Sequence, residues 1–237
     1  MFRRFMVLAI VTAVTLGMAG AADPLSPQDA AKAKKALQEV QEFMGVWNLE
    51  GTQKVGAKTD AWKEDVDWSW RFKATQPTIK VSFAEGKGKY FSSGELTYAV
   101  DKKKYQLTLI AKDKTEQVFV GDKLRDGGLK LERKDAKTGD VHRLTMFTLA
   151  DGVRFMIKVE KQEGGKGLFA LAYQLTGNKE GESLGASAKK PECIVTGGAA
   201  TITVSYQGKT YFVCCSGCRD AFNENPEKFV KAAEKKK

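Results

Sequence analysis

Histidine is almost absent from this sequence: His142 is the single one among 237 residues. One imidazole leaves little room for catalysis by a histidine base. We find neither a Ser-His-Asp set nor paired carboxylates at an interpretable spacing. The glycine-rich stretch 164–167 has no Ser or Thr after its lysine, so it is a hairpin turn and not a phosphate loop. We therefore predict that the protein is not an enzyme.

Long apolar runs are also scarce, and the single candidate lies at the N-terminus. Phe5–Leu16 is apolar apart from two threonines, follows Arg3 and Arg4, and precedes the small-residue site Ala19-Gly20-Ala21. This order is typical of a secretory signal peptide. We predict a signal peptide over residues 1–21 and a periplasmic or secreted mature chain.

An uncleaved membrane anchor is the alternative to this signal peptide. The apolar run is short for a span, which needs about 20 residues. No cysteine directly follows the run, which argues against a lipoprotein anchor. We expect no membrane-spanning segment after signal cleavage.

Positive charge is abundant but not clustered. The formal net charge is +10, and the lysines and arginines are spread along the chain except for the terminal run Lys235-Lys236-Lys237. A nucleic-acid interface would gather its positive charge on one face. We predict a solvated surface and no nucleic-acid partner.

The segment Ser26–Gly45 is predicted to be one helix. Ser26 can cap it, Pro27 suits the first helical position, and Asp29 stands where a capping box needs it. One apolar stripe follows three- and four-residue steps: Ala30, Ala33, Leu37, Val40 and Met44. We interpret the helix as a lid or brace on the next domain, with a partner-binding helix as the alternative.

From residue 46 to 176 the apolar period changes to two, which predicts antiparallel strands with one apolar face. Val66, Trp68, Trp70 and Phe72 alternate with polar residues, and similar runs recur up to the stretch 169–175, which ends with Phe169, Leu171, Tyr173 and Leu175. About ten strands joined by short turns favour an up-and-down barrel, since closure removes exposed strand edges.

The opening Gly45-Val46-Trp47 resembles the Gly-x-Trp start of lipocalin-like barrels. This resemblance implies a mainly β fold in which a helix precedes a ten-stranded antiparallel barrel, and it offers a small apolar ligand as an alternative partner. Some relatives bind haem through a histidine. We interpret His142 as an ordinary strand residue, with haem ligation as the alternative. The tryptophans Trp47, Trp62, Trp68 and Trp70 are expected at the core and rim.

Residues 177–190 contain Gly, Ser, Lys and Glu without apolar periodicity, which indicates a linker. The predicted domains are therefore a helix-braced barrel over 22–176 and a cysteine module over 191–237. We expect the two to move independently.

All four cysteines lie in this module, at Cys193, Cys214, Cys215 and Cys218. A cysteine, a hairpin-length spacer and a tight cysteine cluster form metal-knuckle spacing. The spacer predicts a hairpin from strands over 200–205 and 209–213. Ser216-Gly217 would bend the knuckle, followed by helices over 219–223 and 227–234 around a small core of Phe212, Phe222 and Phe229.

Thiolates bind soft ions, so we predict one metal ion on Cys193, Cys214 and Cys218, with Cys215 or an external group as fourth ligand. Zinc is the first choice and copper(I) the second. Two alternatives stay open. Four cysteines in an exported protein could form two disulfides, and Cys215-x2-Cys218 has thiol-redox spacing, although no thioredoxin-like βαβ pattern surrounds it.

The module is similar to the YHS domain and the related TRASH domain, both small metal-binding modules. The resemblance rests on the segments 191–197 and 204–212, on Cys214-Cys215-Ser216-Gly217-Cys218, and on Phe222 and 225–229. Cys193, Cys214 and Cys218 match the TRASH pattern, Cys215 is additional, and the Tyr-His-Ser triplet is replaced by Phe212-Val213-Cys214. The resemblance implies metal sequestration, delivery or sensing.

Overall fold

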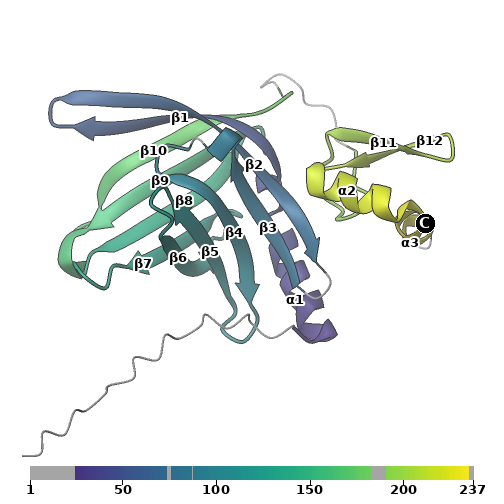
Figure 1. Ribbon diagram of the computed structural model, residues 1–237, viewed down its shortest axis with the longest axis horizontal. Coiled ribbons are helices and arrows are strands. Elements are labelled where there is room, and N and C mark those ends of the chain that lie inside the picture. The colour runs from purple at the N-terminus through teal and green to yellow at the C-terminus, as the bar shows by residue number, and fades with distance from the viewer. Residues whose placement is uncertain (1–24, 74–75, 87, 183–190, 235–237) are drawn as a thin grey trace, which may run out of the picture.

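A ten-stranded antiparallel barrel forms the body of the protein, and a small C-terminal module lies beside it (Figure 1). In this computed structural model the described residues are 25–73, 76–86, 88–182 and 191–234. The predicted signal peptide, residues 1–21, lies outside them. No helix in the described ranges is long and apolar enough to cross a bilayer.

The N-terminal helix α1 (Pro27–Gln38) starts as predicted but is shorter. Ser26 accepts a hydrogen bond of 3.1 Å from the Asp29 backbone N–H, and Pro27 takes the first helical position. The predicted single helix to Gly45 is wrong, because a short 3-10 turn, η1 (Gln41–Phe43), follows after Val40. This break directs Phe43 and Met44 into the core, where both are 1% exposed.

The barrel strands follow in chain order, each paired with its sequence neighbour, and β10 closes onto β1. Their bounds are β1 (Gly45–Val55), β2 (Lys58–Lys73), β3 (Gln76–Phe83), β4 (Phe91–Ala99), β5 (Lys104–Ala111), β6 (Glu116–Lys123), β7 (Leu129–Lys134), β8 (Val141–Leu149), β9 (Arg154–Gln162) and β10 (Ala170–Lys179). Short 3-10 turns η2 (Ala84–Gly86) and η3 (Glu163–Gly165) follow β3 and β9. The closed barrel confirms the predicted mainly β class and fits the lipocalin-like resemblance.

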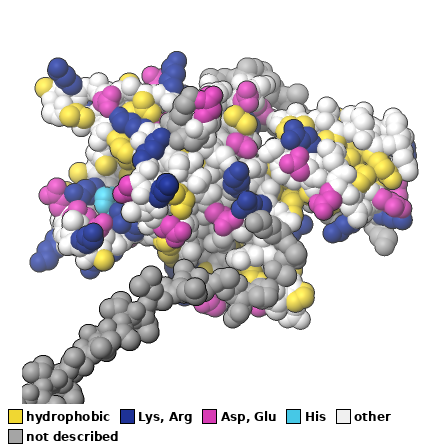
Figure 2. Space-filling model, in the orientation of Figure 1, with side chains coloured by type: hydrophobic (Ala, Val, Ile, Leu, Met, Phe, Trp, Pro, Cys, Tyr) yellow, Lys and Arg dark blue, Asp and Glu magenta, His cyan; other side chains and the backbone are white. Residues whose placement is uncertain are grey.

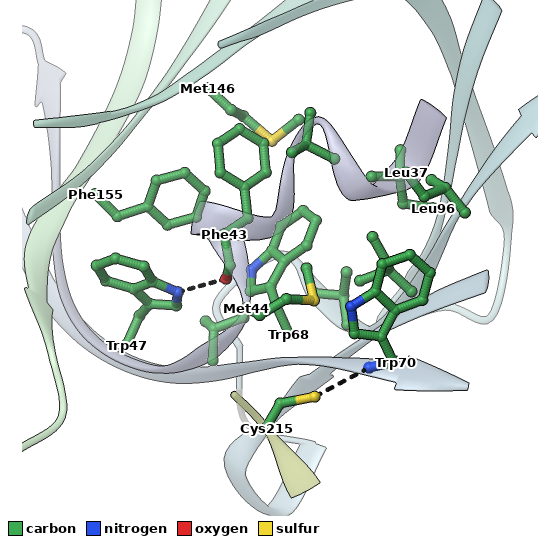
Figure 3. Close-up of a cluster of buried hydrophobic side chains, with 14 of the residues drawn as sticks. Leu37, Phe43, Met44, Trp47, Trp68, Trp70, Leu96, Met146, Phe155 and Cys215 are labelled. Carbon is green, nitrogen blue, oxygen red and sulfur yellow. Dashed lines mark hydrogen bonds between the residues drawn. The ribbon is translucent and has the colours of Figure 1, made fainter. Parts of the chain in front are cut away.

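The helix α1 lies against the barrel (Figure 1), and the buried side chains of α1 and η1 join the core of the barrel, in agreement with the lid or brace interpretation. The Tyr105 hydroxyl donates a hydrogen bond of 2.8 Å to the Ala36 carbonyl, and the Trp47 indole donates one of 2.8 Å to the Phe43 carbonyl. Figure 3 shows Phe43 among Trp47, Trp68 and Phe155, with its ring centroid 4.9 Å from that of Phe155. This aromatic cluster packs the lidded end.

The alternation in β2 is largely as predicted, with one correction. Val66, Trp68 and Trp70 are each 2% exposed, but Phe72 is 36% exposed. Pairing between β1 and β2 ends at Gly45 and Trp68, so β2 continues beyond the barrel wall. There the Phe72 ring stacks on Trp70, with centroids 5.5 Å apart, and does not enter the core.

The last barrel strand differs from the prediction in two ways. A register shift between Leu171 and Tyr173 turns Leu171 outward, where it is 56% exposed, while Leu175 is buried at 7%. An extra residue in a strand changes which face the preceding side chains occupy. In addition, β10 continues to Lys179, so the expected linker start at Gly177 lies within the barrel.

Candidate metal centre

A β-hairpin brings the cysteines of the module together. Strands β11 (Ile202–Tyr206) and β12 (Lys209–Val213) pair around a tight turn in which Gln207 and Gly208 both have positive φ. Such a two-residue turn suits the twist of a hairpin. Cys214 follows β12 directly, so the predicted hairpin and its position before the cluster are confirmed.

A short loop holds Cys193 beside the end of this hairpin. Cys193 donates its N–H to the Gly198 carbonyl at 2.6 Å and accepts from the Gly197 N–H at 2.7 Å. The next residue, Ile194, donates to the Phe212 carbonyl at 2.9 Å. These bonds tie the loop to β12, which leads into Cys214.

The knuckle helix α2 (Ser216–Glu224) begins earlier than predicted. Ser216 and Gly217 belong to its first turn, and the extended residue Cys215 is its N-cap, whose carbonyl accepts from the Arg219 N–H at 3.0 Å. Cys218 therefore lies in the first turn, where N–H groups favour a thiolate. Helix α3 (Pro226–Glu234) starts at Pro226 as expected.

Three of the four sulfurs form one cluster. The Sγ atoms of Cys193, Cys214 and Cys218 all lie within 4.8 Å of one another, and those of Cys214 and Cys218 are 3.5 Å apart. The three residues are buried, at 2%, 4% and 0% exposure. All four cysteines are unbonded thiols. Buried soft donors at this separation fit a single thiolate-bound metal ion.

Cys215 occupies a different position, although it is also buried. Its Sγ lies 3.9 Å from that of Cys214 but outside the mutual 4.8 Å cluster. It accepts a hydrogen bond from the backbone N–H of Trp70 on β2, at 3.5 Å. The sulfur of Cys215 is thus directed to the barrel.

A hydroxyl that the sequence analysis missed borders the cluster. Thr196 is 6% exposed, and its Oγ1 lies 3.5 Å from Cys214 Sγ and 4.0 Å from Cys218 Sγ. Its place three residues after Cys193 was the available signal, but nothing in the spacing says that the loop folds back over the sulfurs. Thr196 can donate to a thiolate and so stabilise it.

Hydrogen bonds link the thiols to one another. Donation from Cys214, and then from Cys218, lowers the pKa of both Cys193 and Cys215. The same bonds raise the pKa of Cys214 and Cys218. Binding a cation would remove the remaining protons, because a metal-bound sulfur is a thiolate.

Two of the three aromatic residues predicted to form the core of the module, Phe222 and Phe229, stack on each other. Phe222 is 1% exposed, and its ring centroid is 6.4 Å from that of Phe229, while Phe212 is half-buried. Tyr211, which was not predicted, adds a third ring at 5.6 Å from Phe222. The core is small, so further contacts are needed to fix the module.

The interior of the barrel contains a small cavity. Near the end away from the lid, about 40 Å³ of space lies between mostly apolar side chains, among them Leu107, Met146 and Tyr173. The carboxylate of Glu64 also borders it and accepts a hydrogen bond of 2.7 Å from the Trp62 indole. His142 is half-buried on β8 and does not line this cavity.

Comparison with known proteins confirms the resemblance of the C-terminal segment. A family model described as the YHS domain matches residues 195–233, and Cys193 lies just before this range. No curated protein matches the chain. The crystal structure of Rv2717c from M. tuberculosis is similar with a TM-score of 0.39 and 15% identity, covering 61% of this chain and 97% of that one.

Proposed function

We propose that this is an exported protein that binds one soft metal ion on the thiolates of Cys193, Cys214 and Cys218. The observation that carries the proposal is the mutual approach of these three sulfurs within 4.8 Å in a buried site. The YHS-domain match supports metal binding as the role of this segment. Sequestration, delivery and sensing are the functions that such a site can serve.

Zinc is the first choice of metal, because a thiolate site for zinc needs no redox partner. Copper(I) is the second, since it accepts fewer ligands and three thiolates suffice for it. The fourth position for zinc would fall to an external group or to Cys215, which would first have to leave the Trp70 amide.

The test is metal analysis of the full chain, purified anaerobically and without chelator, together with titration of free thiols after metal removal. One equivalent of zinc or copper and four titratable thiols are expected. Metal-free protein that takes up neither ion on reconstitution, or protein with two disulfides, would contradict the proposal. Competition between zinc and copper(I) for one site then decides the metal.

A small apolar ligand in the barrel is the second candidate function. The apolar lining of the cavity favours it. Its volume of about 40 Å³ is far below the roughly 300–1,000 Å³ of typical ligand sites. A ligand would therefore have to be very small, and quenching of tryptophan fluorescence by a bound apolar probe would test this.

A further inference from the structure

The cysteine module is attached to a free strand edge of the barrel. Pairing of β1 with β2 stops at Trp68, so β1 offers no partner to the next residues of β2. There the Trp70 N–H donates to Cys215 Sγ at 3.5 Å (Figure 3). A buried backbone donor needs such a partner, and the module provides it.

Gly217 brings α2 against the same residue of the barrel. A Cβ atom on Gly217 would overlap the carbonyl group of Trp70, so any larger side chain would push the two apart. Ser216 adds a hydrogen bond of 3.3 Å from its hydroxyl to the Asp67 carboxylate. On the outer face of β2, Ser69 lies between Asp67 and Trp70 in the sequence and is only 7% exposed. This burial is consistent with the close contact of α2 with β2.

A second attachment joins the lid helix to the loop of Cys193. The Gln38 side chain, on the lid helix α1, donates to the Thr196 carbonyl at 2.9 Å. Thr196 belongs to the loop of Cys193, and its hydroxyl borders Cys214. The body of the protein therefore holds both segments that carry metal ligands: the loop through Gln38, and the knuckle through Trp70.

We propose that barrel docking and metal binding are coupled, with Cys215 and Gly217 positioning the knuckle against Trp70 so that Cys193, Cys214 and Cys218 converge. In the sequence, Cys215 lies between Cys214 and Cys218, and its backbone caps the helix that carries Cys218. Movement of Cys215 away from Trp70 would therefore also move Cys214 and Cys218. This inference rests on the proposed metal site. By linkage, docking strengthens metal binding by the same factor by which metal strengthens docking.

The first experiment uses Gly217→Ala in the full chain, with Asn223→Ala on the exposed side of α2 as the matched control. Metal affinity is measured by competition with a chromophoric chelator, and docking by hydrogen–deuterium exchange of the β2 segment 69–73. We expect Gly217→Ala to keep one metal per chain but to bind it about tenfold more weakly, with faster exchange in β2. Alanine itself favours a helix, so α2 should persist in circular dichroism.

The second experiment changes the lid alone. Gln38→Ala removes the hydrogen bond to Thr196 without altering the module, and Lys35→Ala, exposed on the same helix, is its control. We expect metal affinity to fall about fivefold for Gln38→Ala and to stay unchanged for Lys35→Ala. In the unaltered protein, metal removal should speed exchange in segment 69–73.

The outcomes separate this inference from the proposed function. If both variants bind metal as tightly as the unaltered protein, or if metal removal leaves exchange in β2 unchanged, the coupling is wrong while the metal site stands. If the unaltered protein binds no metal, the proposed function itself fails, and the coupling with it. If Gly217→Ala fails to fold, two other measurements test the coupling: the metal affinity of Gln38→Ala, and the hydrogen exchange of segment 69–73 in the unaltered protein with and without metal.

Discussion

The sulfur atoms of Cys214 and Cys218 lie 3.5 Å apart, across the first turn of α2. Two thiolates cannot approach so closely without a proton or a cation between them, because their charges repel. A zinc ion with bonds of about 2.3 Å to each sulfur fits this separation. The relationship between these two residues is the basis of the first prediction.

Cys193→Ser, Cys214→Ser and Cys218→Ser should each abolish stoichiometric metal binding. Each removes one soft donor from a set of three, and a neutral hydroxyl is a poor replacement for a thiolate. Cys215→Ser should retain one metal per chain at lower affinity, since its sulfur contacts the Trp70 amide. Elemental analysis and chelator competition check this. If Cys215→Ser also loses its metal completely, Cys215 is itself a ligand.

Acid should release the metal. Binding requires thiolates, so protons compete with the ion and the affinity falls as the pH is lowered. Anaerobic titration from pH 8 to about pH 4, followed by thiolate absorbance and free metal, should show reversible loss. Reversal on raising the pH distinguishes protonation from cysteine oxidation. An affinity that does not change with pH would argue against thiolate ligands.

Leu37→Ala should destabilise the lidded end of the barrel. Leu37 is completely buried where α1 covers the barrel, and truncation of a buried leucine costs about 2–5 kcal/mol. Urea unfolding measures the change in the free energy of unfolding. Lys35→Ala, on the exposed face of the same helix, should change it by less than about 0.5 kcal/mol. Equal effects would mean that α1 does not act as a lid.

Truncation after Glu182 should leave a folded barrel, because all ten strands and the closing β1–β10 pair precede that residue. It should also expose the Trp70 edge of β2, lower the melting temperature and promote association through the free edge. Circular dichroism and size-exclusion chromatography test this. A truncated chain without β structure would show that the two-domain division is wrong. Truncation after Thr176 is expected to lower the melting temperature of the barrel further, since it removes three β10 residues that pair with β1.

Asp140→Asn should lower the melting temperature at pH 7, and the effect should vanish in acid. The Gly164 N–H and the Lys161 ammonium group donate to its carboxylate and lower its pKa to about 2. The pKa of Asp140 is lower in the folded protein than in the unfolded chain, where it is about 3.9. The stabilisation is therefore fully present above that pH and is lost as the pH falls through the folded-state pKa of about 2. Thermal melts from pH 7 to 2 measure it, with the exposed Asp101→Asn as the control.

One face of the molecule shows the dispersed positive charge that the sequence predicts. Figure 2 shows lysine and arginine side chains scattered over the visible face and interleaved with acidic ones. Many form exposed pairs such as Lys104–Asp122 and Lys231–Glu227. Such pairs contribute little to stability.

The sequence by itself determined the features that depend on neighbours along the chain. The alternation through Val66, Trp68 and Trp70 predicted a buried barrel face, because successive side chains of a strand point to opposite sides. Ser26 and Pro27 marked the start of α1, and the spacing of Cys193, Cys214 and Cys218 predicted their cluster. In each case a local geometric rule relates the residues to the structure.

Only the tertiary structure decided where these elements meet. The partner of Cys215 is the amide of Trp70, 145 positions away. β1 does not pair with that amide, because β1 begins at Gly45, which lies opposite Trp68. The outward turn of Leu171 likewise depends on a register shift against β9. The periodicity of apolar residues along one segment cannot predict that a strand edge stays unpaired, nor which other segment covers that edge. The identity of Cys215 as part of the docking surface therefore arises from long-range packing, in which burial of a backbone donor requires a partner wherever the folded chain brings one.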